Sequence, residues 1–495
     1  MAEYSFSLST LWYNIVQQLS YNPQEPLMFS SGLFWVLIIF FLPIYALVKS
    51  RRTMMVIFVT LFSLFFFYKS SGLCFFFLLA TSVVDWAIAQ YIDKCKKMVM
   101  RKLALAVSLL CSVGMLVYFK YANFLLFNID AIIGRNFQPL DIILPVGISF
   151  YTFRTVSYVV DVYKKKIPAT TSLLDYVFFL SFFPCLIAGP VVRASEFMPQ
   201  LQENKAPTRE QVYGGMWLIM LGIIKKAVFA DYIAQYVNIA YGNPTGYSGV
   251  ELLMAILGYS MQIYCDFSGY SDMAIGLGSM MGFNLGINFD FPYRSLNVTE
   301  FWRRWHISLS FWLRDYIYIS MGGNRKGKLR QYVNLMTTML VGGLWHGAAW
   351  NFIIWGAGHG LALCVHKFMM PSLKKISDNY VVKFISWLLT FSLVTLLFVF
   401  FRADSFDTVW AMLSGTVTRF DVAYFPIFLK VRYTWCALMI IIFAMHFVPK
   451  DFYERVRTWY INSWWICKFI IFLVVVQLVI EFSSADVQPL IYAQF

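Results

Sequence analysis

Five histidines are the main candidates for acid–base chemistry, because imidazole exchanges protons near neutral pH. His346 lies between two apolar segments, within the sequence GGLWHGAAWN of residues 342–351. Glycines around it allow another backbone or a ligand to approach closely, and Trp345 shapes a pocket. A neutral imidazole there can take a proton from a hydroxyl that attacks an acyl carbonyl. A core histidine satisfied by one hydrogen bond explains the pattern equally well. The five are His306, His346, His359, His366 and His446.

His306 belongs to a basic and aromatic segment, FWRRWHISLSFWLRDY, at residues 301–316. Neighbouring cations predict a lowered pKa for this imidazole. Guanidinium groups also suit phosphates or the anionic arm of a thioester carrier. The alternative is an interfacial helix whose arginines contact lipid headgroups. The candidate donor-site residues here are Arg303, Arg304, Trp305, Arg314 and Asp315.

Two carboxylates, Asp266 and Asp272, stand six residues apart with hydroxyl side chains between them. Such a pair can relay protons or bind a cation, but we favour a polar network that joins broken helices. Gly276 and Gly278 predict close helix packing, and the glycines of residues 322–325 predict a tight polar turn. Neither matches a phosphate-binding loop. Further candidates for lining a site or tunnel are Gln262, Ser268, Asn324, Trp345 and Asn351.

The composition identifies the elements that must position these residues. Hydrophobic residues make up 59% of the 495 and charged residues only 13%, whereas about a quarter of a soluble domain is charged. Lipid must therefore cover much of the apolar surface. The net charge of +14 comes from short basic runs between apolar segments, which argues against nucleic-acid binding. The eight cysteines show neither CxxC pairs nor zinc spacing, so no metal site and no disulfide framework is expected.

Twelve apolar segments predict an all-α, polytopic membrane protein of about 11–13 transmembrane helices. The basic runs at 49–52, 94–102 and 164–166 all fall on the cytoplasmic side if both termini lie outside. Residues 178–190 and 266–344 resist a simple spanning model, and we expect re-entrant or interfacial segments around a chamber. The predicted spans are 31–48, 54–68, 73–89, 103–119, 142–163, 216–232, 250–264, 332–344, 350–368, 381–401, 435–447 and 464–482.

The N-terminal region has no basic segment before an apolar core, so no cleavable signal peptide is expected. Apolar residues recur at helical spacing before the first span, which predicts an interfacial amphipathic helix within residues 1–30. A helix packed on the protein itself is the alternative. Residues 31–495 are predicted to form a single membrane domain. The absence of an internal repeat weakens the case for an inverted-repeat transporter.

Several segments in the same order resemble the membrane-bound O-acyltransferase (MBOAT) family, with the core at residues 144–360. The resemblance is greatest to the membrane subunits of alginate O-acetylation, and next to the teichoic-acid D-alanylation proteins. Ser320 and Met321 depart from the usual Pro-Leu pair, and Ala357 and Gly358 precede His359 where an aromatic residue is common. The segments that carry the resemblance are 144–151, 183–190, 262–278, 301–318 and 344–347.

The resemblance implies a helical fold around a central tunnel, with His346 as the essential catalytic residue and His306 as the second recurrent histidine. It also implies a cytoplasmic donor, acetyl-CoA or another acyl thioester, with no bound cofactor. The implied acceptor is an extracytoplasmic polysaccharide, reached directly or through a periplasmic acyltransferase of the SGNH (serine-esterase) type. Such a protein belongs in the lipid of a bacterial inner membrane and has no nucleic-acid partner.

Other functions stay open from the sequence. One is D-alanyl transfer to a cell-wall polymer, and another is acyl transfer to a lipid or a secreted peptide. An ion- or proton-coupled transporter that uses Asp266 and Asp272 is a third.

Overall fold

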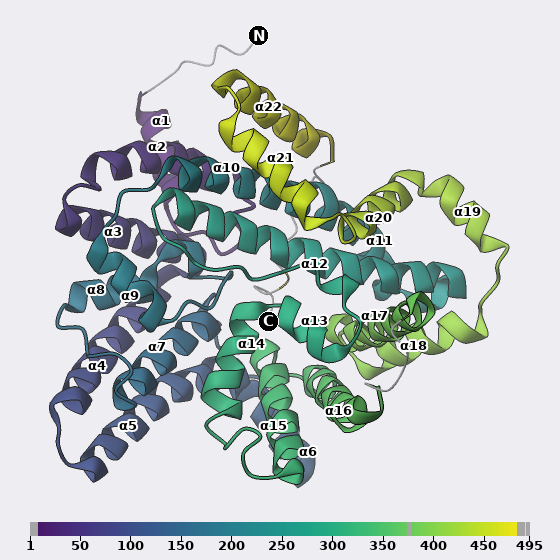
Figure 1. Ribbon diagram of the computed structural model, residues 1–495, viewed down its shortest axis with the longest axis horizontal. Coiled ribbons are helices and arrows are strands. Elements are labelled where there is room, and N and C mark those ends of the chain that lie inside the picture. The colour runs from purple at the N-terminus through teal and green to yellow at the C-terminus, as the bar shows by residue number, and fades with distance from the viewer. Residues whose placement is uncertain (1–7, 374–378, 483–490, 492–495) are drawn as a thin grey trace. The chain divides into compact units, whose positions relative to one another are not determined.

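The computed structural model describes residues 8–373, 379–482 and 491 (Figure 1). In this part of the chain every regular element is a helix. The predicted all-α class is therefore confirmed, and each of the twelve predicted apolar segments overlaps a helix. The chain divides into two compact units, one formed by residues 1–119, 140–187 and 193–206, the other by 120–139, 188–192 and 207–495. The prediction of a single membrane domain over residues 31–495 stays a prediction.

The first unit contains the N-terminal helices and most of the first irregular segment. Arg52 joins two of its helices by an ion pair of 2.6 Å with Asp175. Residues 178–190 begin helical but break into a 3-10 turn, Phe183–Cys185, as expected for a segment interrupted by proline. The helices are α1 Leu8–Leu19, α2 Gly32–Val48, α3 Arg52–Ser71, α4 Phe75–Lys94, α5 Met98–Leu116, α7 Ile148–Tyr163, α8 Leu173–Ser181 and α9 Ala194–Glu203.

Helix α1 lies where the amphipathic helix was predicted. The side chains of residues 8–11 and of Ile15 lie outside the described part. Trp12 and Tyr13 are exposed, and the interfacial position of α1 stays a prediction.

The second unit carries most of the sequence-predicted candidates. It also includes the last residues of a π-helical turn, Val117–Tyr121, which connects α5 to α6. Its helices are α6 Ala122–Ile133, α10 Arg209–Ile223, α11 Asp231–Gly242, α12 Gly249–Met280, α13 Val298–Arg304, α14 Ile307–Leu313, α15 Lys328–His346, α16 Trp350–Leu373, α17 Tyr380–Arg402, α18 Phe406–Thr418, α19 Tyr424–Val431, α20 Tyr433–Met445, α21 Lys450–Asn462 and α22 Trp465–Phe482.

Glycines hold α10 and α12 in backbone contact. A Cβ on Gly269 would lie 2.7 Å from the carbonyl oxygen of Gly222, and one on Gly276 would lie 2.6 Å from that of Gly215. Small residues at such positions allow helices to approach closely where the surroundings are apolar. The predicted role of Gly276 in helix packing is therefore confirmed.

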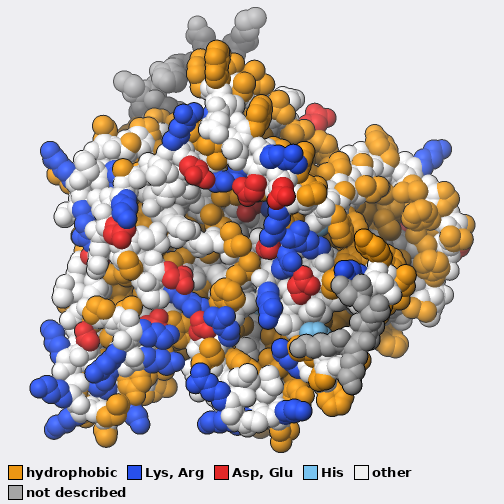
Figure 2. Space-filling view, viewed as in Figure 1, with side chains coloured by type: hydrophobic (Ala, Val, Ile, Leu, Met, Phe, Trp, Pro, Cys, Tyr) orange, Lys and Arg blue, Asp and Glu red, His pale blue; other side chains and the backbone are white. Residues whose placement is uncertain are grey.

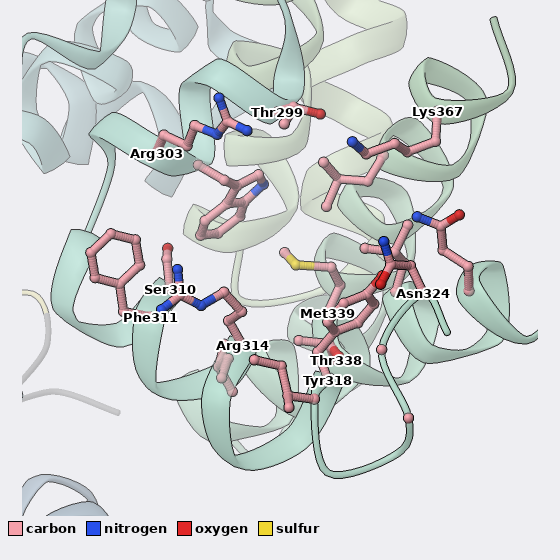
Figure 3. Close-up of a pocket in the computed structure, with 18 of the residues that line it drawn as sticks. Thr299, Arg303, Ser310, Phe311, Arg314, Tyr318, Asn324, Thr338, Met339 and Lys367 are labelled. Carbon is pink, nitrogen blue, oxygen red and sulfur yellow. The ribbon is translucent and has the colours of Figure 1, made fainter. Parts of the chain in front are cut away.

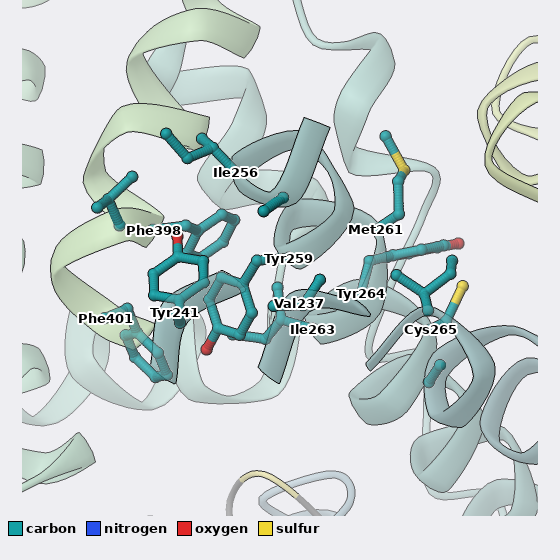
Figure 4. Close-up of a cluster of buried hydrophobic side chains, with 14 of the residues drawn as sticks. Val237, Tyr241, Ile256, Tyr259, Met261, Ile263, Tyr264, Cys265, Phe398 and Phe401 are labelled. Carbon is teal, nitrogen blue, oxygen red and sulfur yellow. The ribbon is translucent and has the colours of Figure 1, made fainter. Parts of the chain in front are cut away.

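Aromatic and aliphatic side chains of α11, α12 and α17 form the main core of this unit (Figure 4). Tyr241 and Tyr259 lie with their ring centroids 6.0 Å apart, and Phe398 meets Tyr259 edge to face at 6.4 Å. This core packs against both α12 and α17. Other residues on these two helices, such as Phe401 of α17, are therefore held on rigid elements.

The described helices include six that are long and apolar enough to cross a membrane, or seven if the bent pair α19–α20 is one span. The remaining predicted spans lie on helices that are shorter or more polar by this test, such as the 16-residue α7 and the buried α12. Hydrophobic side chains cover the surface over α19 and α20 (Figure 2). This surface fits a multi-pass membrane protein, in which lipid replaces water around apolar helices.

Candidate active site

Helices α15 and α16 form an antiparallel pair, and His346 lies at the end where the short connection 347–349 joins the two helices. A Cβ on Gly343 would lie 2.3 Å from the carbonyl oxygen of Phe352, and a Cβ on Gly356 would lie 2.5 Å from that of Met339. Gly347 has no room for a side chain, because its Cβ would meet the ring of Phe352 at 2.1 Å. The predicted close approach of another backbone to this glycine-rich segment is confirmed. His346 is the last residue of α15.

His346 lies inside an aromatic cage and is only 3% exposed. Its ring centroid is 4.9 Å from that of Trp345, 4.9 Å from Trp355 and 5.1 Å from Phe401. Burial lowers the pKa of this imidazole well below its usual value of 6.5, and His306, Lys120 and His359 lower it further. The ring is therefore neutral at pH 7 and able to accept a proton.

His306 lies near the same cage, with its ring centroid 6.0 Å from that of Trp345. Its backbone adopts a left-handed conformation, with φ of 42°, between α13 and α14. The Nδ1 atom is 3.1 Å from Oδ1 of Asn288, which also accepts a hydrogen bond from the hydroxyl of Ser308. Backbone strain of this kind is held only when surrounding contacts demand it.

The predicted direction of the His306 pKa shift is confirmed, but the predicted cause is wrong. Burial alone lowers the pKa to about 3. The neighbouring arginines contribute nothing to this shift, because Arg304 pairs with carboxylates and Arg303 lines a cavity.

A third histidine, His359, extends the cluster from α16. Its Nδ1 accepts a hydrogen bond of 3.3 Å from the indole of Trp302. Trp355 lies between His359 and His346, with its ring centroid 4.9 Å from each. Three of the five histidines are thus connected through three tryptophans, Trp302, Trp345 and Trp355.

A cavity of about 540 Å³ lies against this cluster, between α13, α14, α15 and α16. Figure 3 shows Arg303, Arg314 and Lys367 approaching it from different elements, with Met339 near its middle. Trp302 also lines the cavity, and its indole bonds His359 on the other side. From Met339 to His346 the distance along α15 is about 10 Å, seven residues at 1.5 Å each.

A second cavity of about 710 Å³ adjoins the first and shares Thr299, Arg303 and Lys367 with it. Neither Arg303 nor Lys367 forms an ion pair within the part of the chain that the structure describes. Lys and Arg side chains gather over α13 and the turn before α15 (Figure 2). The two cavities therefore offer unneutralised cations to an anionic ligand.

Arg304 and Arg314 are less available than their neighbours. Arg304 donates to Asp290 at 3.0 Å and lies 2.9 Å from Glu300. Arg314 lines the first cavity but lies 2.7 Å from Asp315. Among the described residues Arg303 has no carboxylate partner, unlike the three other charged candidates of this segment.

The remaining candidates fall into two groups. Asn324 lines the first cavity and lies in the turn that was predicted, in which Gly322 and Gly323 have positive φ. Trp305 packs in the main core instead, and Asn351 donates to the carbonyl of Ala403 at 2.6 Å. Gln262 and Ser268 are buried on α12 and line neither of these two cavities.

The acidic pair of α12 is neutralised by two lysines from the π-helical turn Ile224–Ala230. Lys225 lies 2.6 Å from Asp272. Lys226 lies 2.7 Å from Asp266 and 2.8 Å from Asp231. Buried charges are retained where they are paired, so these contacts favour the polar-network interpretation over a proton or cation pathway.

The sequence did not predict several contacts of the candidate residues. These are the contact of Asn288 with His306, the link of His359 to His346 through Trp355, and the ion pairs of Lys225 and Lys226 with Asp272 and Asp266. The lysines gave one usable signal, because a charge inside an apolar segment requires a partner. Asn288 gave none, since it stands 18 residues from His306 and only the fold brings the two together.

Comparison with known proteins decides the family. The profile of the MBOAT, membrane-bound O-acyltransferase family, matches residues 152–401, about half of the chain. The chain belongs to this family. His306, His346 and His359 all fall within the matched region, and the MBOAT assignment makes the protein a multi-pass membrane acyltransferase.

The MBOAT relatives modify different polymers. The chain is 38% identical over 366 residues to the peptidoglycan O-acetyltransferase of Helicobacter pylori, covering 69% of each protein. It is 46% identical over 309 residues to a probable alginate O-acetylase of Azotobacter vinelandii, covering 61% of this chain and 60% of that protein. The teichoic acid D-alanyltransferase of Bacillus subtilis is 30% identical over 283 residues, covering 54% of this chain and 71% of that protein.

Proposed function

We propose that this protein transfers an acetyl group from a thioester donor to a hydroxyl of an extracytoplasmic polysaccharide, with His346 as the general base. The observation that carries the proposal is the placement of the neutral, caged His346 about 10 Å along α15 from a cationic cavity. The cavity suits an anionic donor such as acetyl-CoA. The cage suits the reacting acyl group, because an apolar site excludes water that would hydrolyse it.

The two cavities support a donor with several anionic groups. Arg303 and Lys367 line both cavities and have no carboxylate partners in the described chain. Guanidinium binds phosphate through paired hydrogen bonds, and the lysine ammonium acts as a point charge. Further cations are Arg325 and Lys326 in the turn before α15 and Lys328 at the start of α15. Under the positive-inside rule this side faces the cytoplasm, where acyl thioesters are made.

The reaction proposed for His346 is a direct acyl transfer. The acceptor hydroxyl loses its proton to the imidazole as its oxygen attacks the acyl carbonyl carbon. The tetrahedral intermediate then collapses, the carbon–sulfur bond breaks, and the thiolate takes the proton back from the imidazolium. The products are an ester and a free thiol. General-base catalysis of this kind contributes about 10²–10⁴-fold.

His306 supports this reaction through its contact with Trp345. Asn288 fixes the orientation of the His306 ring, and Trp345 lies close to both imidazoles. We assign His306 to positioning this wall of the cage.

The class of acceptor is inferred from the names of the relatives. An O-acetyltransferase of peptidoglycan and O-acetylases of alginate are among the similar proteins, so a polysaccharide is the acceptor class that fits best. In this proposal the attacking hydroxyl belongs either to the polysaccharide itself or to a periplasmic SGNH-type partner that passes the acetyl group on, and the protein lies in a bacterial inner membrane. D-alanyl transfer uses the same thioester chemistry and differs only in donor and acceptor.

Purified protein in proteoliposomes, supplied with acetyl-labelled CoA and an oligosaccharide acceptor, tests the proposal. His346→Ala is expected to lower the transfer rate by about 10²–10⁴-fold while the protein keeps its elution volume and melting temperature. The matched control is His446→Gln, because His446 is also a buried histidine of this unit but bonds only the carbonyl of Ile442 in its own helix. Transfer by a well-folded His346→Ala variant at the wild-type rate refutes the role of His346.

A further inference from the structure

The helix that carries His346 ends on two side chains from the π-helical turn Val117–Tyr121. Lys120 donates from Nζ to the carbonyl oxygen of Trp345 at 2.7 Å and to that of His346 at 3.0 Å. The hydroxyl of Tyr121 donates to the carbonyl of Leu344. Both donors belong to the same compact unit as α15. Three successive carbonyls at the end of α15 are therefore bound from one neighbouring turn.

These carbonyls have no partners within their own helix. The last four carbonyls of any α-helix lack an intrahelical donor, and a glycine in left-handed conformation often satisfies them. Gly347 follows α15 but is extended, with φ of −168° and ψ of 156°, and makes no capping hydrogen bond. An unsatisfied carbonyl in an apolar interior is costly, so Lys120 and Tyr121 supply what the local sequence does not.

The charge of Lys120 also suits its position. A helix carries partial negative charge at its C-terminal end, and a cation placed there is stabilised. The π-helical turn occurs inside an otherwise continuous helical segment from Met98 to Ile133. Such turns are rare and are found frequently at functional sites. Here the turn directs two consecutive side chains to consecutive carbonyls of α15.

We propose that Lys120 is a positioning residue, which fixes the end of α15 and thereby the orientation of the His346 ring, and which keeps a positive charge beside that ring. This inference rests on the proposed function of His346. The groups that act electrostatically on His346 are His306 from the start of α14, His359 from α16 and Lys120 itself. Of these three groups Lys120 is the one whose ammonium binds the C-terminal carbonyls of α15, a position that favours a cation.

Three substitutions separate the hydrogen bonds from the charge. Lys120→Met removes both, Lys120→Gln keeps a donor but removes the charge, and Lys120→Arg keeps both with a longer side chain. For Lys120→Met we expect kcat to fall about 10- to 100-fold, the cost of misplacing a catalytic group by about 1 Å. The KM for acetyl-CoA should stay within about twofold, because Lys120 does not line either donor cavity.

The pH profile of kcat distinguishes positioning of His346 from general support of the fold. Removing the cation should move the acid limb of the profile to higher pH in Lys120→Met and Lys120→Gln, and Lys120→Arg should restore the wild-type limb. Lys97→Met is the control, because Lys97 is an exposed lysine before α5.

The outcomes separate this inference from the proposed function. If Lys120→Met does not fold, Lys120→Gln alone decides the matter through its kcat and its acid limb. A wild-type kcat and an unmoved acid limb in a folded Lys120→Gln variant overturn the inference, provided that His346→Ala is inactive. Activity in His346→Ala overturns the proposed function instead, whatever the lysine variants do.

Discussion

Replacing Arg303 by glutamine should weaken the binding of an anionic acyl donor and leave the chemical step nearly unchanged. Arg303 lines both cavities and has no ion-pair partner in the described chain, whereas His346 lies beyond Trp302 and His359. A contact made equally in the ground state and the transition state changes KM without changing kcat. The variant should therefore raise the KM for acetyl-CoA and keep its kcat within about twofold.

The size of the effect follows from the kind of contact. A hydrogen bond to a charged group contributes about 1.5–3 kcal/mol. Arg303 is exposed, so solvent screening reduces its contribution, and we take about 1–2 kcal/mol. Because 1.4 kcal/mol is a factor of ten in affinity, the expected rise in KM is about 5- to 30-fold. Salt should also raise the KM of the wild type more than that of Arg303→Gln.

Initial rates at varied acetyl-CoA concentration, in proteoliposomes at low and high salt, measure this effect. Arg294→Gln is the matched control, because Arg294 lies 3.6 Å from Asp290 and lines neither cavity. A KM equal to that of the wild type, with the loss confined to kcat, would refute the assignment of these cavities to the donor. Equal increases in both arginine variants would refute a specific role for Arg303.

Three further predictions concern stability. Gly269→Val should lower the melting temperature, because any Cβ there meets the backbone of α10 and overpacking costs about 1–3 kcal/mol. Gly114→Ala is the control and should leave the melting temperature unchanged, because a Cβ on Gly114 would have nothing within 4 Å. Asp272→Asn should destabilise by about 1.5–3 kcal/mol, because the partly buried Lys225 loses the charge of its partner, and Lys225→Met with Asp272→Leu should recover most of that loss. Because His306 has a folded pKa of about 3, below its unfolded value, its contribution to stability should be lost as pH falls from about 6.5 towards 3, as thermal melts across pH would show.

The sequence predicted the local features of the site well. Glycines next to His346 predicted a close backbone approach, and α15 and α16 make that contact through Gly343 and Gly356. Glycines at residues 322–325 predicted a turn, which the structure has. The period and length of apolar segments predicted helices at every span. These features depend on neighbouring residues alone, so a local pattern is enough to find them.

Local sequence patterns could not predict which residues contact the site residues. Asn288 meets His306 across a left-handed backbone position, and Lys120 reaches His346 across 226 residues. Only tertiary packing creates these contacts, and a single sequence does not report it. The mistaken cause for the His306 pKa has the same origin. Arginines close in sequence turned away from the ring, towards carboxylates or a cavity.

The separation of the donor's anionic part from the reacting ring is the feature that joins the cavities to the chemistry. Cations line the cavity beside Trp302, while the ring centroid of the apolar Trp355 indole lies 4.9 Å from those of both His359 and His346. A phosphate close to the imidazole would raise the cost of the developing oxyanion. Holding the anionic part of a donor among the cavity cations and only its acyl end in the cage avoids this penalty. A long, flexible thioester arm meets that geometric requirement, which is why a carrier-bound acyl group fits this site better than a compact acyl phosphate does.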